Sequence, residues 1–195
     1  LLKAIRGHTI ESPDVATTLK TGRPNACNLC HLDKTLDWTA EHLAKRAGKP
    51  KVEVPPIHHN TAASAVWLLN GDAGQRALAA WHMGWEPAMI ASGSSWQSPL
   101  LADTLTDPYS AVRYIAHKAL VKQPGFLAYK YDFVADEAKR LAKQKEAMGI
   151  WLREQRIKTP LSAGPVLLNA QGVRDVDRVQ TLIRTRDNRP MRLRE

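Results

Sequence analysis

Cysteine is scarce in this 195-residue chain, and its only two cysteines lie within one stretch of five residues. No third cysteine remains for a structural disulfide elsewhere or for a zinc site of four cysteines. No run of residues approaches the roughly 18–20 apolar residues that a transmembrane helix needs. The sequence also lacks a G-x-S-x-G elbow, a phosphate-binding loop and an H-E-x-x-H pair. These absences argue against several common enzyme classes and predict no transmembrane segment in this chain.

The composition is that of a chain that folds. Hydrophobic residues make up 44% of it, and six of its residues are tryptophan. A chain of 195 residues forms one or two ordinary domains and can bury a sizeable core. The first residue is Leu1 and not methionine, which we expect to reflect processing or a missing upstream portion.

The two cysteines belong to the stretch Cys27-Asn28-Leu29-Cys30-His31. This is the C-x-x-C-H pattern for covalent attachment of a c-type haem. The two thiols can add across the two vinyl groups of one porphyrin, and the histidine is then placed under the iron. We therefore expect one covalent haem c, held by Cys27 and Cys30, with His31 as the proximal axial ligand.

Three other interpretations of a Cys-x-x-Cys pair stay open at this point. A thioredoxin-like dithiol favours a βαβ setting, and no strand pattern lies near the pair. A zinc site normally needs a second Cys/His pair at similar spacing, whereas His58 and His59 are adjacent. The third is a chance match in a structural loop. The pattern favours haem over all three.

The hydrophobic pattern predicts a mainly α fold. Leu36, Leu43 and Ala47 recur at helical spacing after the motif, which predicts an amphipathic helix from about 34 to 47. Prolines mark a linker before a long helical region. The expected parts are a haem-binding segment with an irregular lead-in (1–50), a linker (51–60), short HEAT-like helical repeats with a capping helix (61–157) and an extended basic tail (158–195).

An internal repeat supports the helical-repeat interpretation. Arg76, Leu78 and Ala79 align with Arg113, Ile115 and Ala116, and a short helical stretch precedes each set. A period of roughly 40 residues with two helices per unit is what HEAT-like repeats show. We expect Asp107 and Pro108 to begin the second arginine-containing helix, with the aspartate as its cap. The capping helix is expected over about 132–156, and a further short helix is indicated near 176–183.

The region around the motif resembles part of a known family. The matching residues are the series from Arg6 to Ile10, Pro13, the series from Gly22 to Lys34, and Trp38. They are similar to a late haem site in bacterial multihaem c-type cytochromes, which carry tetratricopeptide or HEAT-like repeats after the haem part. The resemblance is close over about 5–40 and similar in kind over 61–125. It implies an extracytoplasmic electron-transfer protein that is either a piece of a multihaem chain or a monohaem descendant of one.

Iron in an electron-transfer haem usually takes a second protein ligand. The resemblance aligns His8 with a distal ligand of the family, so His8 is the first candidate. His58 and His59 could fold back from the linker, and Met83 ends the first arginine-containing helix. An open sixth position, which would permit peroxidase-like chemistry, is the remaining possibility.

Other residues are candidates for the surroundings of the haem. Trp38 and Leu36 are candidates for pocket walls, and ordinary helix packing is the equally favoured alternative for both. Arg6 or Arg23 could pair with the haem propionates, since guanidinium and carboxylate groups bind each other in a bidentate manner.

The predicted function is therefore electron transfer by a covalent c-type haem, without enzymatic activity. The protein would be a subunit or fragment of a larger periplasmic or otherwise extracytoplasmic redox assembly. A helical-repeat scaffold in which the haem is mainly structural is the alternative. The net charge of +9 predicts redox partners or neighbouring cytochrome subunits with an acidic surface. No nucleic-acid-binding motif accompanies the basic residues, so we expect no nucleic acid partner.

Overall fold

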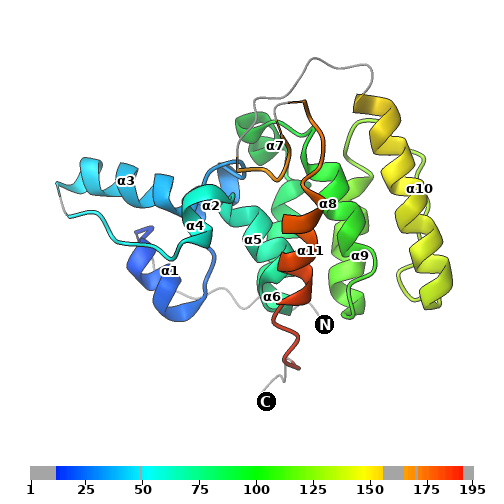
Figure 1. The fold of residues 1–195 in the computed structure, drawn as a ribbon, viewed down its shortest axis with the longest axis horizontal. Helices are drawn as coiled ribbons and strands as arrows, with labels where there is room; N and C mark the ends of the chain where they lie inside the picture. The colour runs from blue at the N-terminus through cyan, green and yellow to red at the C-terminus, as the bar shows by residue number, and fades with distance from the viewer. Residues whose placement is uncertain (1–11, 49, 156–164, 170, 191–195) are drawn as a thin grey trace.

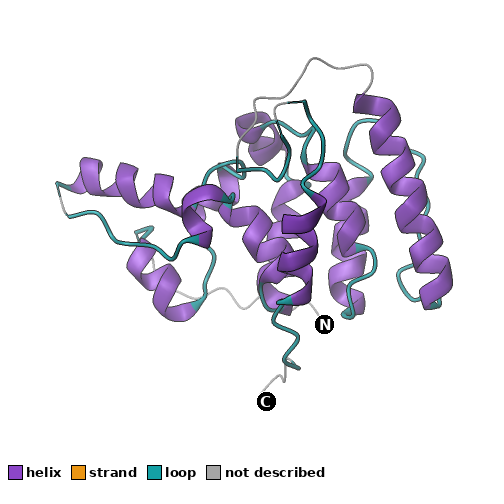
Figure 2. Cartoon of the chain, in the orientation of Figure 1, coloured by secondary structure: helices purple, strands orange, loops and turns teal. Residues whose placement is uncertain are grey.

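The computed structural model of the protein describes residues 12–48, 50–155, 165–169 and 171–190. Over these residues the fold is mainly α, as the sequence predicts, with helices and loops and no strand (Figure 2). Two isolated bridges, Thr35 with Ala62 and Leu168 with Arg174, are the β-type pairings between these residues. No helix within the described ranges is both long and apolar enough to cross a bilayer. The helices are α1 (Val15–Thr21), α2 (Ala26–Cys30), α3 (Leu36–Ala47), α4 (Ile57–Asn60), α5 (Ala63–Asn70), α6 (Ala73–Met83), α7 (Glu86–Ser92), α8 (Gln97–Thr104), α9 (Ser110–Leu120), α10 (Glu137–Gln155) and α11 (Val176–Arg184).

The N-terminal helices form an arm beside a helical body. Helices α1 and α3 extend to one side, α2 and α4 join them to the body, and α10 covers the opposite end (Figure 1). The sequence led us to expect an irregular lead-in before the motif, but residues 15–21 form α1. Asp14 caps this helix by accepting hydrogen bonds from the backbone N–H of Ala16 and Thr17, and Gly22 ends it at φ 73°. Both ends carry residues that favour helix boundaries.

The helical body contains two stacked pairs, α5 with α6 and α8 with α9. Helix α6 packs along α9 and α5 along α8. The two pairs approach each other closely where Gly84 meets Ala119. A Cβ added to Gly84 would lie only 2.7 Å from the Cα of Ala119. These four helices are close to the pairs expected from the internal repeat. Helix α7, between the two pairs, was not expected.

The aligned arginines of the two pairs meet at one aspartate. Arg76 is 1% exposed, and its Nε lies 2.8 Å from Oδ2 of Asp107. Arg113 donates from Nη1 to the backbone carbonyl of Asp107 at 2.7 Å. We expected Asp107 to cap the second helix, yet α9 begins at Ser110 after Tyr109. The Asp107 side chain is buried among arginines, and its Oδ1 also accepts a hydrogen bond from the Tyr109 N–H at 2.8 Å. The helix therefore starts later than the sequence indicated.

The C-terminal part contains the short helix expected near 176–183, as α11, and it is not extended over its described residues. Helix α11 packs against α5, with Val179 and Leu182 buried. Asn70 donates to the carbonyl of Leu182 at 3.0 Å, and Arg178 donates to the Thr61 hydroxyl at 2.6 Å. The tail is therefore folded back on the body over its described residues. Residues 158–164 and 191–195 of the expected tail lie outside the described part.

Candidate functional site

The C-x-x-C-H motif occupies a short helix and the residue after it. The side chain of Asn25 accepts a hydrogen bond from the backbone N–H of Cys27 at 3.0 Å and so begins α2. Cys27 and Cys30 are three residues apart on this helix, which places them on one face. His31 ends the helix, and its N–H donates to the Cys27 carbonyl at 2.8 Å. Both thiols are free and half-buried. Two thiols and an imidazole therefore lie together at one end of α2.

Asn28, between the two cysteines, fixes α2 against α3. It is fully buried. Its Nδ2 donates to the carbonyls of Lys34 at 3.1 Å and Thr35 at 3.2 Å, and its Oδ1 accepts from the Thr39 hydroxyl at 2.7 Å. The residue between the cysteines thus anchors the helix through polar contacts, so the thiols need not take part in packing α2 on α3.

The segment after His31 is fixed to α5. The Ser64 hydroxyl donates to the Leu32 carbonyl at 2.6 Å, and both residues are fully buried. Thr35 and Ala62 form the first isolated bridge. These contacts hold the backbone that follows the motif in place and so restrict the position of the His31 ring.

Helices α6 and α7 contact α2 as well. The Ser92 hydroxyl lies 3.3 Å from the Cys30 carbonyl, which accepts its hydrogen bond. The His82 imidazole hydrogen-bonds to the backbone of Leu29, and burial lowers the pKa of His82 although this hydrogen bond opposes the shift. Helix α2 is therefore held by α3, α6 and α7 together.

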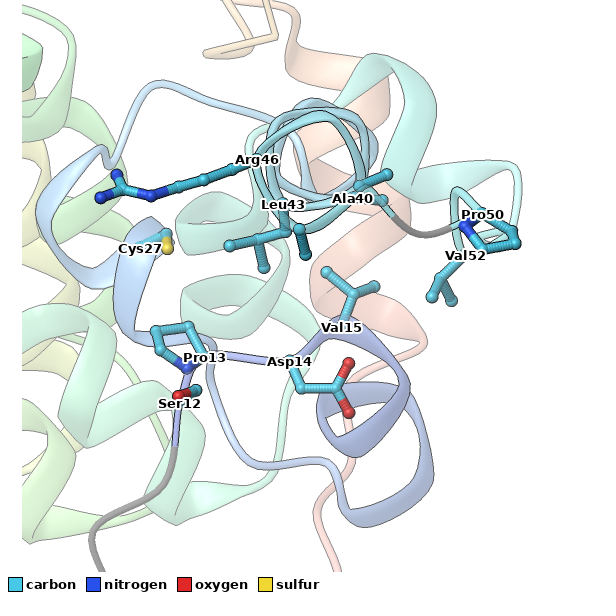
Figure 3. A pocket seen from close by; sticks show the side chains of 12 residues that line it. Ser12, Pro13, Asp14, Val15, Cys27, Ala40, Leu43, Arg46, Pro50 and Val52 are labelled. Atoms are coloured by element: carbon cyan, nitrogen blue, oxygen red, sulfur yellow. The ribbon is translucent and has the colours of Figure 1, made fainter.

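Two connected cavities open beside the thiols. The larger has a volume of about 730 Å³ and is lined by Cys27, Cys30, His31 and one face of α3. The second, of about 630 Å³, shares Pro13, Cys27, Leu43 and Arg46 with the first and extends towards Val15 and Val52 (Figure 3). The lining of both cavities is mostly apolar.

The surroundings of the Cys27 thiol raise its pKa. Burial raises its pKa most, a backbone hydrogen bond opposes this shift, and the nearby Cys30 makes a smaller contribution that raises the pKa. Redox-active dithiols rely on a lowered cysteine pKa. The environment of Cys27 therefore keeps the thiol protonated at neutral pH and argues against the dithiol interpretation.

The structure places three of the four candidates for a second axial ligand, and none of these three lines a cavity beside the thiols. His8 lies outside the described residues. His59, on α4, has its Nδ1 3.3 Å from Oδ1 of Asp37 and its Nε2 3.1 Å from the Val54 carbonyl. His58 is its neighbour on the same helix, and Met83 is fully buried in the core. Among the described residues that line the two cavities, none of these three is present.

The expected surroundings are found in part. Trp38 lines the larger cavity, and its ring centroid is 5.4 Å from that of His31. Leu36 is fully buried and belongs to the core cluster. It therefore packs into the core and does not line either cavity. Arg23 lines a neighbouring cavity of about 230 Å³, which shares Ser12, Pro13 and Asp14 with the second cavity. Arg6 lies outside the described residues.

Two residues of α3 that line the larger cavity, His42 and Arg46, were not expected there. His42 lies with its Nδ1 2.8 Å from the Trp38 carbonyl, and its ring is 4.1 Å from the Trp38 ring. Arg46 lines both cavities. Positions 38, 42 and 46 follow each other at four-residue spacing, so they share one helix face. That spacing was the available signal in the sequence.

Within the described ranges, no group of three or more His, Cys, Asp or Glu side chains is arranged to hold a metal ion. A haem would take one axial ligand from this motif, so it needs no such group. Compared with known proteins, the chain matches no family model, no curated protein and no solved structure.

Proposed function

We propose that the chain binds one c-type haem covalently and transfers electrons through it. The observation that supports this most directly is the placement of two half-buried thiols and the His31 imidazole along one mostly apolar cavity of about 730 Å³. Ligand cavities in proteins have volumes of about 300–1,000 Å³. The cavity is therefore suitable in size and character for a porphyrin.

The thiols suit the attachment chemistry. Addition of an S–H group across a vinyl C=C bond forms one carbon–sulfur bond, and the sulfur proton goes to the other vinyl carbon, so no oxidant is consumed. Cys27 and Cys30 lie on one helix face and can therefore react with the two vinyl groups along one edge of a macrocycle. Once bound, the haem supplies an iron that cycles between the ferrous and ferric states.

The protein would supply the ligand, the orientation and the environment. His31 is positioned by the backbone contacts on both sides of it, and Trp38 packs beside its ring. Burial, axial ligands and hydrogen bonds are the means by which a protein sets haem potential. His8 remains our first candidate for the distal ligand. An open sixth position would be the basis of peroxidase-like chemistry, and otherwise we expect no catalysis.

The site and the charge also define the setting that we propose. Covalent haem attachment takes place outside the cytoplasm in bacteria, so we place the protein in the periplasm or another extracytoplasmic location, as a subunit of a larger redox assembly. The net charge of +9 favours a redox partner with an acidic surface.

Expression of the chain with an export signal in a bacterium that matures c-type cytochromes tests the proposal. We expect the intact mass to include one haem and the spectrum to show a c-type haem. The Cys27→Ser/Cys30→Ser variant should carry no covalent haem. His31→Ala should lose the wild-type spectrum, whereas the control His117→Ala, on α9, should retain it. Bare thiols, a cystine or bound zinc in the wild type would contradict the proposal.

A second candidate function is a scaffold in which the haem is mainly structural. It is favoured by an exposed aromatic pair on the helical body, which we earlier expected to contain HEAT-like repeats. Trp81 is 53% exposed and Trp85 38% exposed, and their rings stack with centroids 6.1 Å apart. Exposed apolar groups of this size are used in protein interfaces. A haem that resists reduction and oxidation while the assembly still forms would favour this candidate over electron transfer.

A further inference from the structure

We infer that Arg46 binds the carboxylates of the tetrapyrrole, which makes this residue the anion-binding part of the cavity. The inference rests on the proposed function and goes beyond it, because it assigns a residue to the propionate side chains. Arg46 lies in the last turn of α3 and lines both cavities. Figure 3 shows its side chain extending over the cavity on the same side as Cys27.

Arg46 differs from neighbouring basic residues in that it forms no ion pair with an acidic side chain among the described residues. Lys45, on the same helix turn, lies 2.7 Å from Oε1 of Glu41, and Lys51 lies 2.6 Å from Oδ1 of Asp37. Within the part of the chain that the structure describes, no carboxylate lies within ion-pair distance of Arg46. A cation beside an apolar cavity gains most from an anion that the cavity itself brings in.

The other ionisable side chains along the cavities do not provide the same function. Besides Arg46, the charged or titratable residues that line them are Asp14, Cys27, Cys30, His31, His42 and Lys45. The Asp14 carboxylate accepts hydrogen bonds from the backbone N–H of Ala16 and Thr17 and is occupied as the cap of α1. Lys45 is paired with Glu41. Arg46 is thus the cation best placed to attract an anion to the cavity.

The chemistry of the ligand matches this arrangement. A tetrapyrrole of the c-type haem class joins an apolar ring to two carboxylates. The cavities join apolar walls to the Arg46 guanidinium, which forms no ion pair with the residues that the structure describes. A guanidinium presents parallel N–H groups that fit a carboxylate in a bidentate manner, and a lysine does not. Arg46 is therefore our candidate for this role, for which the sequence alone had suggested Arg23 or Arg6, the latter outside the described residues.

The midpoint potential of the holoprotein as a function of pH tests the inference. The variants are Arg46→Gln and Arg46→Lys, with Lys45→Gln as a control that removes the same charge one residue away. An opposite charge within a few ångströms lowers a carboxyl pKa by about 1–3 units. We expect Arg46→Gln to lower the potential and to move the propionate inflection at least about 1 pH unit upwards. Arg46→Lys should give an intermediate result, and Lys45→Gln should leave the inflection in place.

The outcomes separate this inference from the proposed function. If the wild type carries no covalent haem, the proposed function fails. If haem is attached and the inflection of Arg46→Gln coincides with that of the wild type or of Lys45→Gln, only the assignment of Arg46 fails. Because Arg46 is exposed at the end of α3, the variants are expected to fold, and unfolding curves of the three variants check this.

Discussion

The hydroxyl of Thr39 donates a hydrogen bond of 2.7 Å to Oδ1 of Asn28, and both side chains are buried. This bond connects the residue between the two cysteines with the helix that forms the cavity wall. The relative position of the thiols and the face of α3 therefore depends in part on this pair of polar side chains.

Replacement of Thr39 by valine should destabilise the protein. The valine has nearly the same shape, but Oδ1 of Asn28 then loses its partner in a buried site, which costs about 1–3 kcal/mol. Urea unfolding of the apoprotein measures the change. Thr21→Val is the matched control, because the Thr21 hydroxyl donates to the Thr17 carbonyl at an exposed position. Equal stability of the two variants would show that the bond between Thr39 and Asn28 is not needed.

Replacement of Asp107 by asparagine should be more damaging. Asp107 is fully buried and lies 2.8 Å from Arg76 and 3.1 Å from Arg186. Removing one partner of a buried ion pair leaves an uncompensated charge and costs about 3–5 kcal/mol. Glu53→Gln, which removes an exposed carboxylate, is the control and should cost less than about 0.5 kcal/mol. A small and equal effect of both variants in thermal unfolding would contradict the role of Asp107.

The pH dependence of the unfolding free energy should reveal the raised pKa of Asp103. Burial raises the pKa of Asp103 to about 6, although the guanidinium of Arg174 and the amide of Gln144 oppose the shift. In the unfolded chain the pKa is about 3.9. Between these values the folded state binds more protons, so the free energy of unfolding should fall as the pH rises from about 4 to 6.

Asp103→Asn removes that contribution. The difference in unfolding free energy between wild type and variant should change by about 3 kcal/mol across this window. Urea unfolding at intervals between pH 4 and pH 7 measures it. A difference that stays constant with pH would mean that Asp103 has an ordinary pKa in the folded protein.

Local sequence patterns predict most of the helices, because the apolar spacing and the capping residues that mark a helix lie within it or next to it. Leu36, Leu43 and Ala47 predict α3 by their spacing, and the structure has this helix. Helix α1 was not predicted, because its threonines interrupt the apolar spacing that marks a helix. Asp14 and Gly22 nevertheless mark its two ends. The start of α9 was misplaced, and the buried contacts of Asp107 with arginines from α6 and from the C-terminal segment were not anticipated. Such long-range contacts cannot be inferred from spacing along the chain.

The candidate site could be predicted to a similar extent. The spacing of Cys27, Cys30 and His31 suffices to place them together, because one helix turn relates them. The positions of His42 and Arg46 depend on which face of α3 meets the cavity. That face depends on contacts between separate elements, among them the bond between Asn28 and Thr39.

The Cys27 thiol provides the last prediction, made for the protein without haem. Burial and the nearby Cys30 raise the pKa of Cys27, so little thiolate should be present at neutral pH. The thiolate is the reactive form of cysteine. Alkylation of Cys27 by iodoacetamide, followed by mass spectrometry in the Cys30→Ser variant, should be slower at pH 7 than alkylation of free cysteine. The rate should rise steeply only at a pH above the ionisation of free cysteine. Rapid alkylation near pH 6 would instead indicate a lowered pKa, as in redox-active dithiols, and would restore the interpretation that the structure disfavours.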